Sequence, residues 1–341
     1  GQGEPSCQSF WHLMNLLAKW WSIVPDRRLW RSTPPAVFFV CLGLFGLGLG
    51  WRSAADVLPV PHEIGDLLLG FALAFYLYFL AFYLRKLIAR PSVLFDDLSS
   101  PPARAAMSAA AMSMMLLAAA LLPLGISVPL IWWMGVVLQI GASGIACWVI
   151  WREPHEKRYF TPHQFLTFVG PVVGPIAGIP LGYVIESILL TLAALVPFLV
   201  ITVGYAIQSM RAPPPVKMRP TLTIFLAPIG LFAISFGLLQ VDWAFTGFYW
   251  ASTLTALVLL TQVRWMVAAG WSPQWASFTF PSTVFLSVQV MAVANGFGFA
   301  AVLGVGLGMA ISTPVVLFVT YRYVMLWVTG ELAEQTGAAK V

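Results

Sequence analysis

The stretch 298–320, GFAAVLGVGLGMAISTPVVLFVT, decides the fold class of this protein, because none of its side chains is charged. A helix needs about 20 mostly apolar residues to cross a hydrocarbon core that is about 30 Å thick. The stretch is long enough to cross such a core once. It therefore predicts a membrane-spanning helix.

Further apolar runs of similar length fill most of the chain: 35–51, 66–84, 103–122, 129–151, 163–181, 184–208, 221–239, 244–263 and 275–294. Of the 341 residues, 60% are hydrophobic and 9% are charged. Soluble domains carry about 25% charged residues, so a soluble protein is excluded. The sequence predicts an all-α integral membrane protein with ten transmembrane helices.

The positive charges divide unevenly between the two sides of this arrangement. When the chain crosses ten times, 17 of the 18 Lys and Arg residues fall on the side of the two termini, and Arg52 alone falls on the other. Membrane proteins keep Lys- and Arg-rich loops in the cytoplasm. We therefore predict a multi-pass protein of the cell (inner or plasma) membrane with both termini cytoplasmic.

A proline marks the beginning of every odd-numbered run: Pro34, Pro101, Pro162, Pro220 and Pro273. Ser or Thr precedes all of them except Pro220, and Ser or Thr as N-cap with Pro as the first helical residue is a favourable helix start. This repeat predicts five successive helical hairpins. It also places five helix N-termini on the cytoplasmic face, where their partial positive charges favour anions.

Three parts of the chain follow from these runs. Residues 1–32 form an N-terminal interfacial segment, in which the Trp-rich stretch Ser9–Trp21 predicts a short helix at the membrane surface. Residues 33–325 form the transmembrane domain. Residues 326–341 form a short cytoplasmic tail.

Residue patterns for enzyme chemistry are lacking in this sequence. The four histidines have no metal-ligand spacing, and there is no phosphate-binding loop. We expect no catalytic residues, no metal, no cofactor and no nucleic-acid partner, so the protein is not expected to be an enzyme. Its expected surroundings are the lipid bilayer and its expected ligands are small inorganic or organic anions.

One carboxylate and four prolines inside the runs are candidate functional residues. Glu186 is the ionisable residue that lies clearly inside a run, about one turn from its start, where it is either an interfacial residue or a group for proton coupling.

Prolines bend helices and free backbone carbonyls, which membrane proteins tolerate beside a cavity. The candidates among the prolines inside odd-numbered runs are Pro171, Pro175, Pro228 and Pro281. They predict kinked odd-numbered helices around a central pore with even-numbered helices outside, the alternative being kinks that serve only packing.

Four short motifs carry a resemblance to a known family. They are FFVCLGLFGLGLGW at Phe38–Trp51, Ser100-Pro101 with Arg104, Leu226-Ala227-Pro228, and WASFTFP at Trp275–Pro281. Their order and spacing over 33–325 resemble the tellurite-resistance/dicarboxylate transporter family. This family includes the bacterial tellurite-resistance protein A and the plant guard-cell slow anion channels. One departure is Cys41, which stands where the family often has a proline.

The resemblance implies a homotrimer in which each protomer has its own pore. Five odd-numbered helices would surround the pore, and a phenylalanine of the ninth helix, matched here by Phe280, would plug it. We therefore expect a channel or transporter that passes small anions through a pore gated by Phe280. Two alternatives remain: a proton-coupled exporter of dicarboxylate, sulfite or tellurite-type anions that uses Glu186, and a membrane sensor whose N-terminal segment or tail binds a partner.

Overall fold

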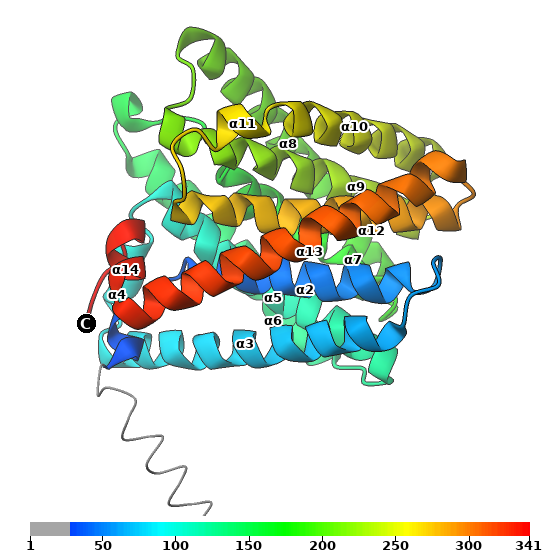
Figure 1. Cartoon of the computed structure of the whole chain (residues 1–341). Helices are drawn as coiled ribbons and strands as arrows, with labels where there is room; N and C mark the ends of the chain where they lie inside the picture. Colours follow the sequence, from blue (N-terminus) through cyan, green and yellow to red (C-terminus); the bar gives the residue numbers. More distant parts are fainter. Residues whose placement is uncertain (1–27) are drawn as a thin grey trace, which may run out of the picture.

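The computed structural model describes residues 28–341, and this part of the chain consists of helices and connecting loops without any strand. The predicted surface helix at Ser9–Trp21 lies outside the described residues. Figure 1 shows the long helices running roughly side by side, with short helices at their ends.

Nine helical segments of the described part are long and apolar enough to cross a membrane. They are α2 (Val37–Ala54), α3 (His62–Ala89), α5 (Pro101–Leu121) with η2 (Leu122–Leu124), α6 (Pro129–Arg152), α8 (Val184–Arg211), η6 (Val216–Phe225) with α9 (Leu226–Leu238), α10 (Asp242–Thr261), η7 (Pro273–Phe278) with α12 (Thr279–Ala294), and α13 (Gly298–Thr329). Short helices lie between or beyond them: η1 (Leu29–Ser32), α4 (Val93–Asp97), η3 (His155–Lys157), α11 (Val263–Met266) and α14 (Glu331–Thr336). Each of the nine coincides with a predicted run.

The remaining predicted run, 163–181, does not form one continuous helix. It contains the π-helix η4 (Phe165–Val169), the 3-10 helix η5 (Gly170–Val173) and one turn of α-helix, α7 (Pro175–Gly178). Two prolines explain the interruption, because Pro171 and Pro175 have no backbone N–H and clash with the preceding turn of an α-helix. A segment of the right length and hydrophobicity is therefore present, but it is broken in the middle.

Burial separates the long segments into two groups. In the apolar stretches of α2, α5, η6–α9 and η7–α12, between 67 and 78% of the residues are buried, and we call these segments the inner helices. In α3, α6, α8, α10 and α13 the corresponding share is 22–39%, and we call these the outer helices. The outer helices expose large apolar side chains such as Leu67, Ile185 and Trp243. An exposed apolar surface of this kind fits contact with lipid.

The predicted helix starts are only partly present. Ser100 caps α5, because its side chain accepts a hydrogen bond from the backbone N–H of Ala103, and Pro101 is the first helical residue. The hydroxyl of Thr33 instead donates to the carbonyl of Leu29, and α2 begins only at Val37. The runs 221–239 and 275–294 begin in the 3-10 helices η6 and η7, and the run 163–181 begins in a turn before the π-helix η4, all without a side-chain cap. The five predicted helix starts are therefore not structurally equivalent.

The beginning and the end of the described chain meet at one end of the bundle, which we call the terminal end (Figure 1). The backbone N–H of Val341 donates to the carbonyl of Arg31, and the N–H of Ala339 donates to a carboxylate oxygen of Asp97. The other Asp97 oxygen lies 3.1 Å from the Lys86 ammonium, and both side chains are fully buried. The helix α13 runs on to Thr329, so the first residues of the predicted tail are helical.

Charge is distributed along the bundle as the sequence predicts. Arg52, at the last turn of α2, lies at the opposite end and forms an ion pair with Asp66 near the start of α3. The other Lys and Arg residues of the described part lie on the helix ends, loops and tail of the terminal end. Within the described residues, Arg52 is thus the one Lys or Arg residue at this end, as in the sequence count, and the Asp66 carboxylate neutralises its charge.

Two glycines allow α2 to approach α12 closely. A Cβ atom added to Gly43 would lie 2.7 Å from the Cβ of Thr279, and one added to Gly46 would lie 3.0 Å from the Cβ of Thr283 and 3.1 Å from the Phe280 ring. Small residues at such crossings let helix backbones pack tightly within membranes. The position of α12, and of Phe280 on it, therefore depends on these glycines.

We predict that Gly46→Leu destabilises the fold by about 1–3 kcal/mol, because the larger side chain must push α12 away from α2. The melting temperature of the purified protein in detergent measures this loss. Gly70→Leu is the matched control, because nothing lies within 4 Å of a Cβ added there on the exposed side of α3. Equal melting temperatures for the two variants would contradict the prediction.

Candidate functional site

Three cavities follow one another along the inner helices. The terminal vestibule, at the terminal end, has a volume of about 420 Å³. The narrow cavity has a volume of about 40 Å³ and shares Phe39, His163, Pro273 and Gln274 with that vestibule. The opposite vestibule has a volume of about 430 Å³ and shares only Leu231 and Phe280 with the narrow cavity. Phe280 thus lies where the path between the two ends is interrupted.

The inner part of the fold supplies the walls of this path. Every residue that lines the narrow cavity or the opposite vestibule belongs to an inner helix, to the broken segment 163–181, or to the residues directly beside them. The outer helices α3, α6, α8 and α10 contribute none. The predicted arrangement, with odd-numbered segments inside and even-numbered helices outside, agrees with this lining.

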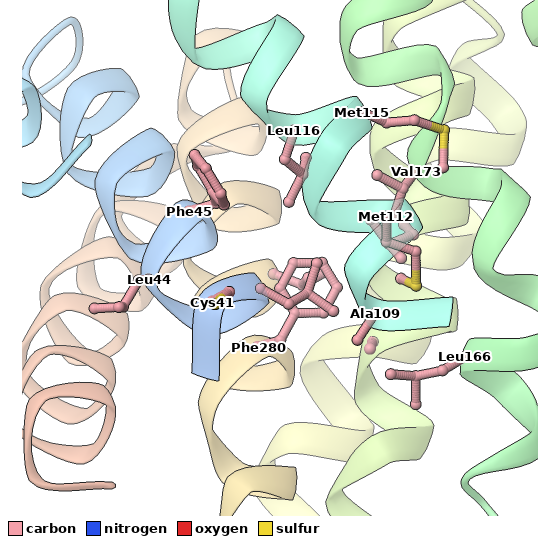
Figure 2. Packing of buried hydrophobic residues seen from close by; sticks show 14 of the residues in the cluster. Cys41, Leu44, Phe45, Ala109, Met112, Met115, Leu116, Leu166, Val173 and Phe280 are labelled. Atoms are coloured by element: carbon pink, nitrogen blue, oxygen red, sulfur yellow. The ribbon is translucent and has the colours of Figure 1, made fainter. Parts of the chain in front are cut away.

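Phe280 is the second residue of α12 and is buried, with 6% of its surface exposed. Figure 2 shows its ring between α2 and α5, with Cys41 on one side and Ala109 on the other. The hydroxyl of Thr283 donates to the Phe280 carbonyl over 2.7 Å. The surroundings of the ring are apolar on the sides that Figure 2 displays.

The four predicted kink prolines all lie where the helix type changes. Pro228 and Pro281 are the third residues of α9 and α12, directly after the 3-10 helices η6 and η7. Pro171 lies in η5 and Pro175 begins α7. By contrast, Pro197 in α8 and Pro314 in α13 lie inside uninterrupted helices. Cys41 also lies inside an uninterrupted helix, because α2 continues through it.

The broken segment is held by side chains from neighbouring helices. The Gln139 amide of α6 donates to the carbonyls of Leu166 and Thr167, both over 3.1 Å. The Trp132 indole of α6 donates to the carbonyl of Gly174 over 2.9 Å. The Gln139 bonds supply donors to two carbonyls of the π-helix η4, whereas the Gly174 carbonyl also accepts from the backbone N–H of Gly178. Side-chain donors of this kind allow an irregular backbone at membrane depth. Sequence reasoning missed Gln139, and its signal was a lone amide inside the apolar run 129–151.

The lining of the path carries hydrogen-bond donors but no acid. None of the three cavities has an Asp or Glu in its lining, and Lys217, in the terminal vestibule, is the one Lys or Arg there. His163 lies at the join between the terminal vestibule and the narrow cavity and is 2% exposed. Sequence reasoning considered His163 only as a metal ligand. Within the described residues, no group of three or more His, Cys, Asp or Glu side chains is close enough to hold a metal.

Glu186 is not brought together with the other candidate residues. It lies in the first turn of the outer helix α8, and it lines none of the three cavities. The structure therefore brings Phe280, Pro228 and Pro281 together in the lining of the narrow cavity, whereas Pro171, Pro175 and Glu186 line none of the three cavities.

We predict that Gln139→Leu lowers the stability of the protein by about 1–3 kcal/mol, because the Leu166 carbonyl loses its side-chain donor and the Thr167 carbonyl keeps only the Ser143 hydroxyl. The melting temperature in detergent measures the loss. Gln262→Leu removes an exposed amide beside α11 and is the matched control, expected to leave the melting temperature unchanged. A stable Gln139→Leu protein would mean that the broken segment does not need this support.

Comparison with known proteins identifies the family. The model of the voltage-dependent anion channel (SLAC1) family matches residues 32–325, which include all inner and outer helices up to most of α13. A search of curated proteins found no match. The family match confirms the resemblance that the four sequence motifs suggest. Members of this family are channels and transporters rather than enzymes. The chain is thus a multi-pass membrane protein that belongs to the voltage-dependent anion channel family.

Proposed function

We propose that this protein is an anion channel whose pore follows the three cavities and is closed by the ring of Phe280. The observation that carries the proposal is the sequence of cavities, about 420, 40 and 430 Å³, with Phe280 at the junction of the last two. For this path to connect the two ends of the protein, the side chain of Phe280 has to move.

The charge of the lining supports anions as the permeant species. A cation pathway commonly carries rings of Asp or Glu, whereas anion pores carry Lys, Arg or neutral donors. The three cavities lack carboxylates, and their lining includes Lys217, His163 and Gln274. Neutral donors in a cavity of 40 Å³ suit a small inorganic anion better than a dicarboxylate or tellurite-type anion, which is bulkier.

The chemistry of the junction supports closure by exclusion of water. Phe280 and Leu231 are the residues shared by the narrow cavity and the opposite vestibule, and both are apolar. A hydrophobic constriction blocks ions because water, and with it a hydrated ion, does not enter. The proton-coupled carrier that the sequence offers as an alternative would use Glu186, and Glu186 lines none of the three cavities. The channel is therefore the function that the site supports better.

We predict that Phe280→Ala raises anion conductance by about an order of magnitude or more, because removal of the ring joins the narrow cavity to the opposite vestibule. Recordings from the purified protein in planar bilayers, in symmetric chloride, measure the change. A Phe280→Ala protein that folds and stays closed would contradict the gate.

Two further variants serve as controls in the same recordings. Phe278 lies in a groove lined by α10, α12 and α13, and its ring is 5.7 Å from that of Trp275. Phe278→Ala should therefore cost packing and leave conductance low. Glu186→Gln, made together with Phe280→Ala, should leave the anion flux unchanged. Loss of flux on this change, in a folded protein, would favour the proton-coupled carrier instead.

We further propose that the protein is a homotrimer in the cell membrane with ten spanning segments, five hairpins and a cytoplasmic terminal end. The trimer is what the family resemblance implies. The number and orientation of the spanning segments are supported by the basic terminal end, by the lone Arg52 at the other end, and by the broken segment in the place of the fifth span. Single cysteines at Arg52 and Arg158, labelled in intact cells with an impermeant reagent, test the sidedness. We predict labelling at Arg52 only; labelling of both positions, or particle mass of a monomer in detergent, would contradict the arrangement.

A further inference from the structure

The polar side chains of the narrow cavity gather at its terminal end. Sixteen of its lining residues are apolar or glycine, and the polar ones are His163, Gln274 and Ser277. His163 is the first residue of the broken segment, whereas Gln274 and Ser277 lie in η7, directly before the helix of Phe280. Two separate parts of the chain thus bring three hydrogen-bonding side chains to one small cavity beside the gate.

These three side chains retain hydrogen-bonding capacity that the protein does not use. The Nδ1 of His163 lies 3.4 Å from the Thr161 hydroxyl, which leaves the Nε2 of the ring available. The Gln274 amide carries two N–H donors. The Ser277 hydroxyl, which is 8% exposed, has no hydrogen-bond partner within the described part of the chain. Donors are therefore available to a ligand in the cavity.

The size of the cavity decides what such a ligand can be. A cavity holds one water molecule when its volume, measured in the same way, is roughly 10–15 Å³. The narrow cavity, with about 40 Å³, therefore accommodates one small ion with little of its water shell. A buried charge is costly unless hydrogen bonds replace the lost water. Since the cavity has donors and no carboxylate, its lining favours an anion over a cation.

We propose that His163, Gln274 and Ser277 form a binding site for one small monovalent anion, such as a halide or nitrate, directly on the terminal side of the gate. The proposal rests on the proposed channel function and gives it a site that selects the ion. An anion that arrives from the terminal vestibule exchanges water for these donors and waits there until Phe280 moves.

The test measures how chloride conductance saturates in the open Phe280→Ala background, in planar bilayers. A hydrogen bond to a charged group is worth enough that its loss raises the half-saturating chloride concentration about tenfold. We expect this increase for His163→Leu and for Gln274→Leu, and a smaller increase for Ser277→Ala. The matched control is Ser282→Ala, because Ser282 lines the groove on the other face of α12 and its hydroxyl donates to the Thr279 carbonyl. Its half-saturation should not change.

An isosteric variant guards against effects of misfolding. Gln274→Glu keeps the shape of the side chain and places a carboxylate in the cavity, so the chloride-to-sodium permeability ratio should fall about tenfold or more. If chloride flows but neither half-saturation nor this ratio changes in any of these variants, the anion site is wrong and the pore stands. If the Phe280→Ala protein passes no anions at all, the pore and the site are both wrong.

Discussion

Inside a membrane, the backbone N–H and C=O groups must form hydrogen bonds within the protein, because no water is present to bind them. The arrangement of the helices in this protein depends on that constraint. Helices that face lipid must be continuous, so α8 and α13 keep their helical form even around Pro197 and Pro314. Helices that face the interior are released from this requirement, because neighbouring side chains can supply the missing partners. Changes between 3-10, π and α geometry are accordingly found in the inner helices and in the broken segment.

The support of the broken segment shows how the two layers depend on one another. Gln139 and Trp132 belong to an outer helix, yet their donors satisfy carbonyls of the inner segment. Ser235 of the inner helix α9 adds a third donor, to the carbonyl of Val172. Because each such bond fixes a stretch of irregular backbone, the walls of the narrow cavity are held from outside as well as from within. The outer helices therefore shape the path without lining it.

Sequence reasoning reached the all-α membrane fold and nine of the spanning segments, and it selected Phe280, Pro228 and Pro281, which line the narrow cavity. The reasons for this are physical. The length of a hydrophobic run directly predicts whether a helix can cross the bilayer. A proline restricts the backbone of its own helical turn in any surroundings. The distinction between Pro171, which lies in a break, and Pro314, which does not, was beyond the sequence because it depends on which neighbours can donate hydrogen bonds. The same holds for His163 and Gln274, whose proximity is created by packing between distant parts of the chain. Glu186 was selected by polarity alone, and polarity does not tell which side of α8 faces the path.

The placement of charge along the proposed pore also follows from the cost of desolvation. A full positive charge at the narrowest point would hold an anion strongly and slow its release, whereas conduction requires binding that is weak enough to reverse. In this protein Lys217, an exposed side chain, lines the wide terminal vestibule, and the polar side chains beside Phe280 are an imidazole, an amide and a hydroxyl. In the proposed pore, Lys217 thus attracts anions at the wide end, where water screens its charge. The polar side chains of the narrow cavity replace the water shell of the anion. With this division, the proposed gate needs no charge, because exclusion of water by a single apolar ring would be sufficient to close the proposed pore.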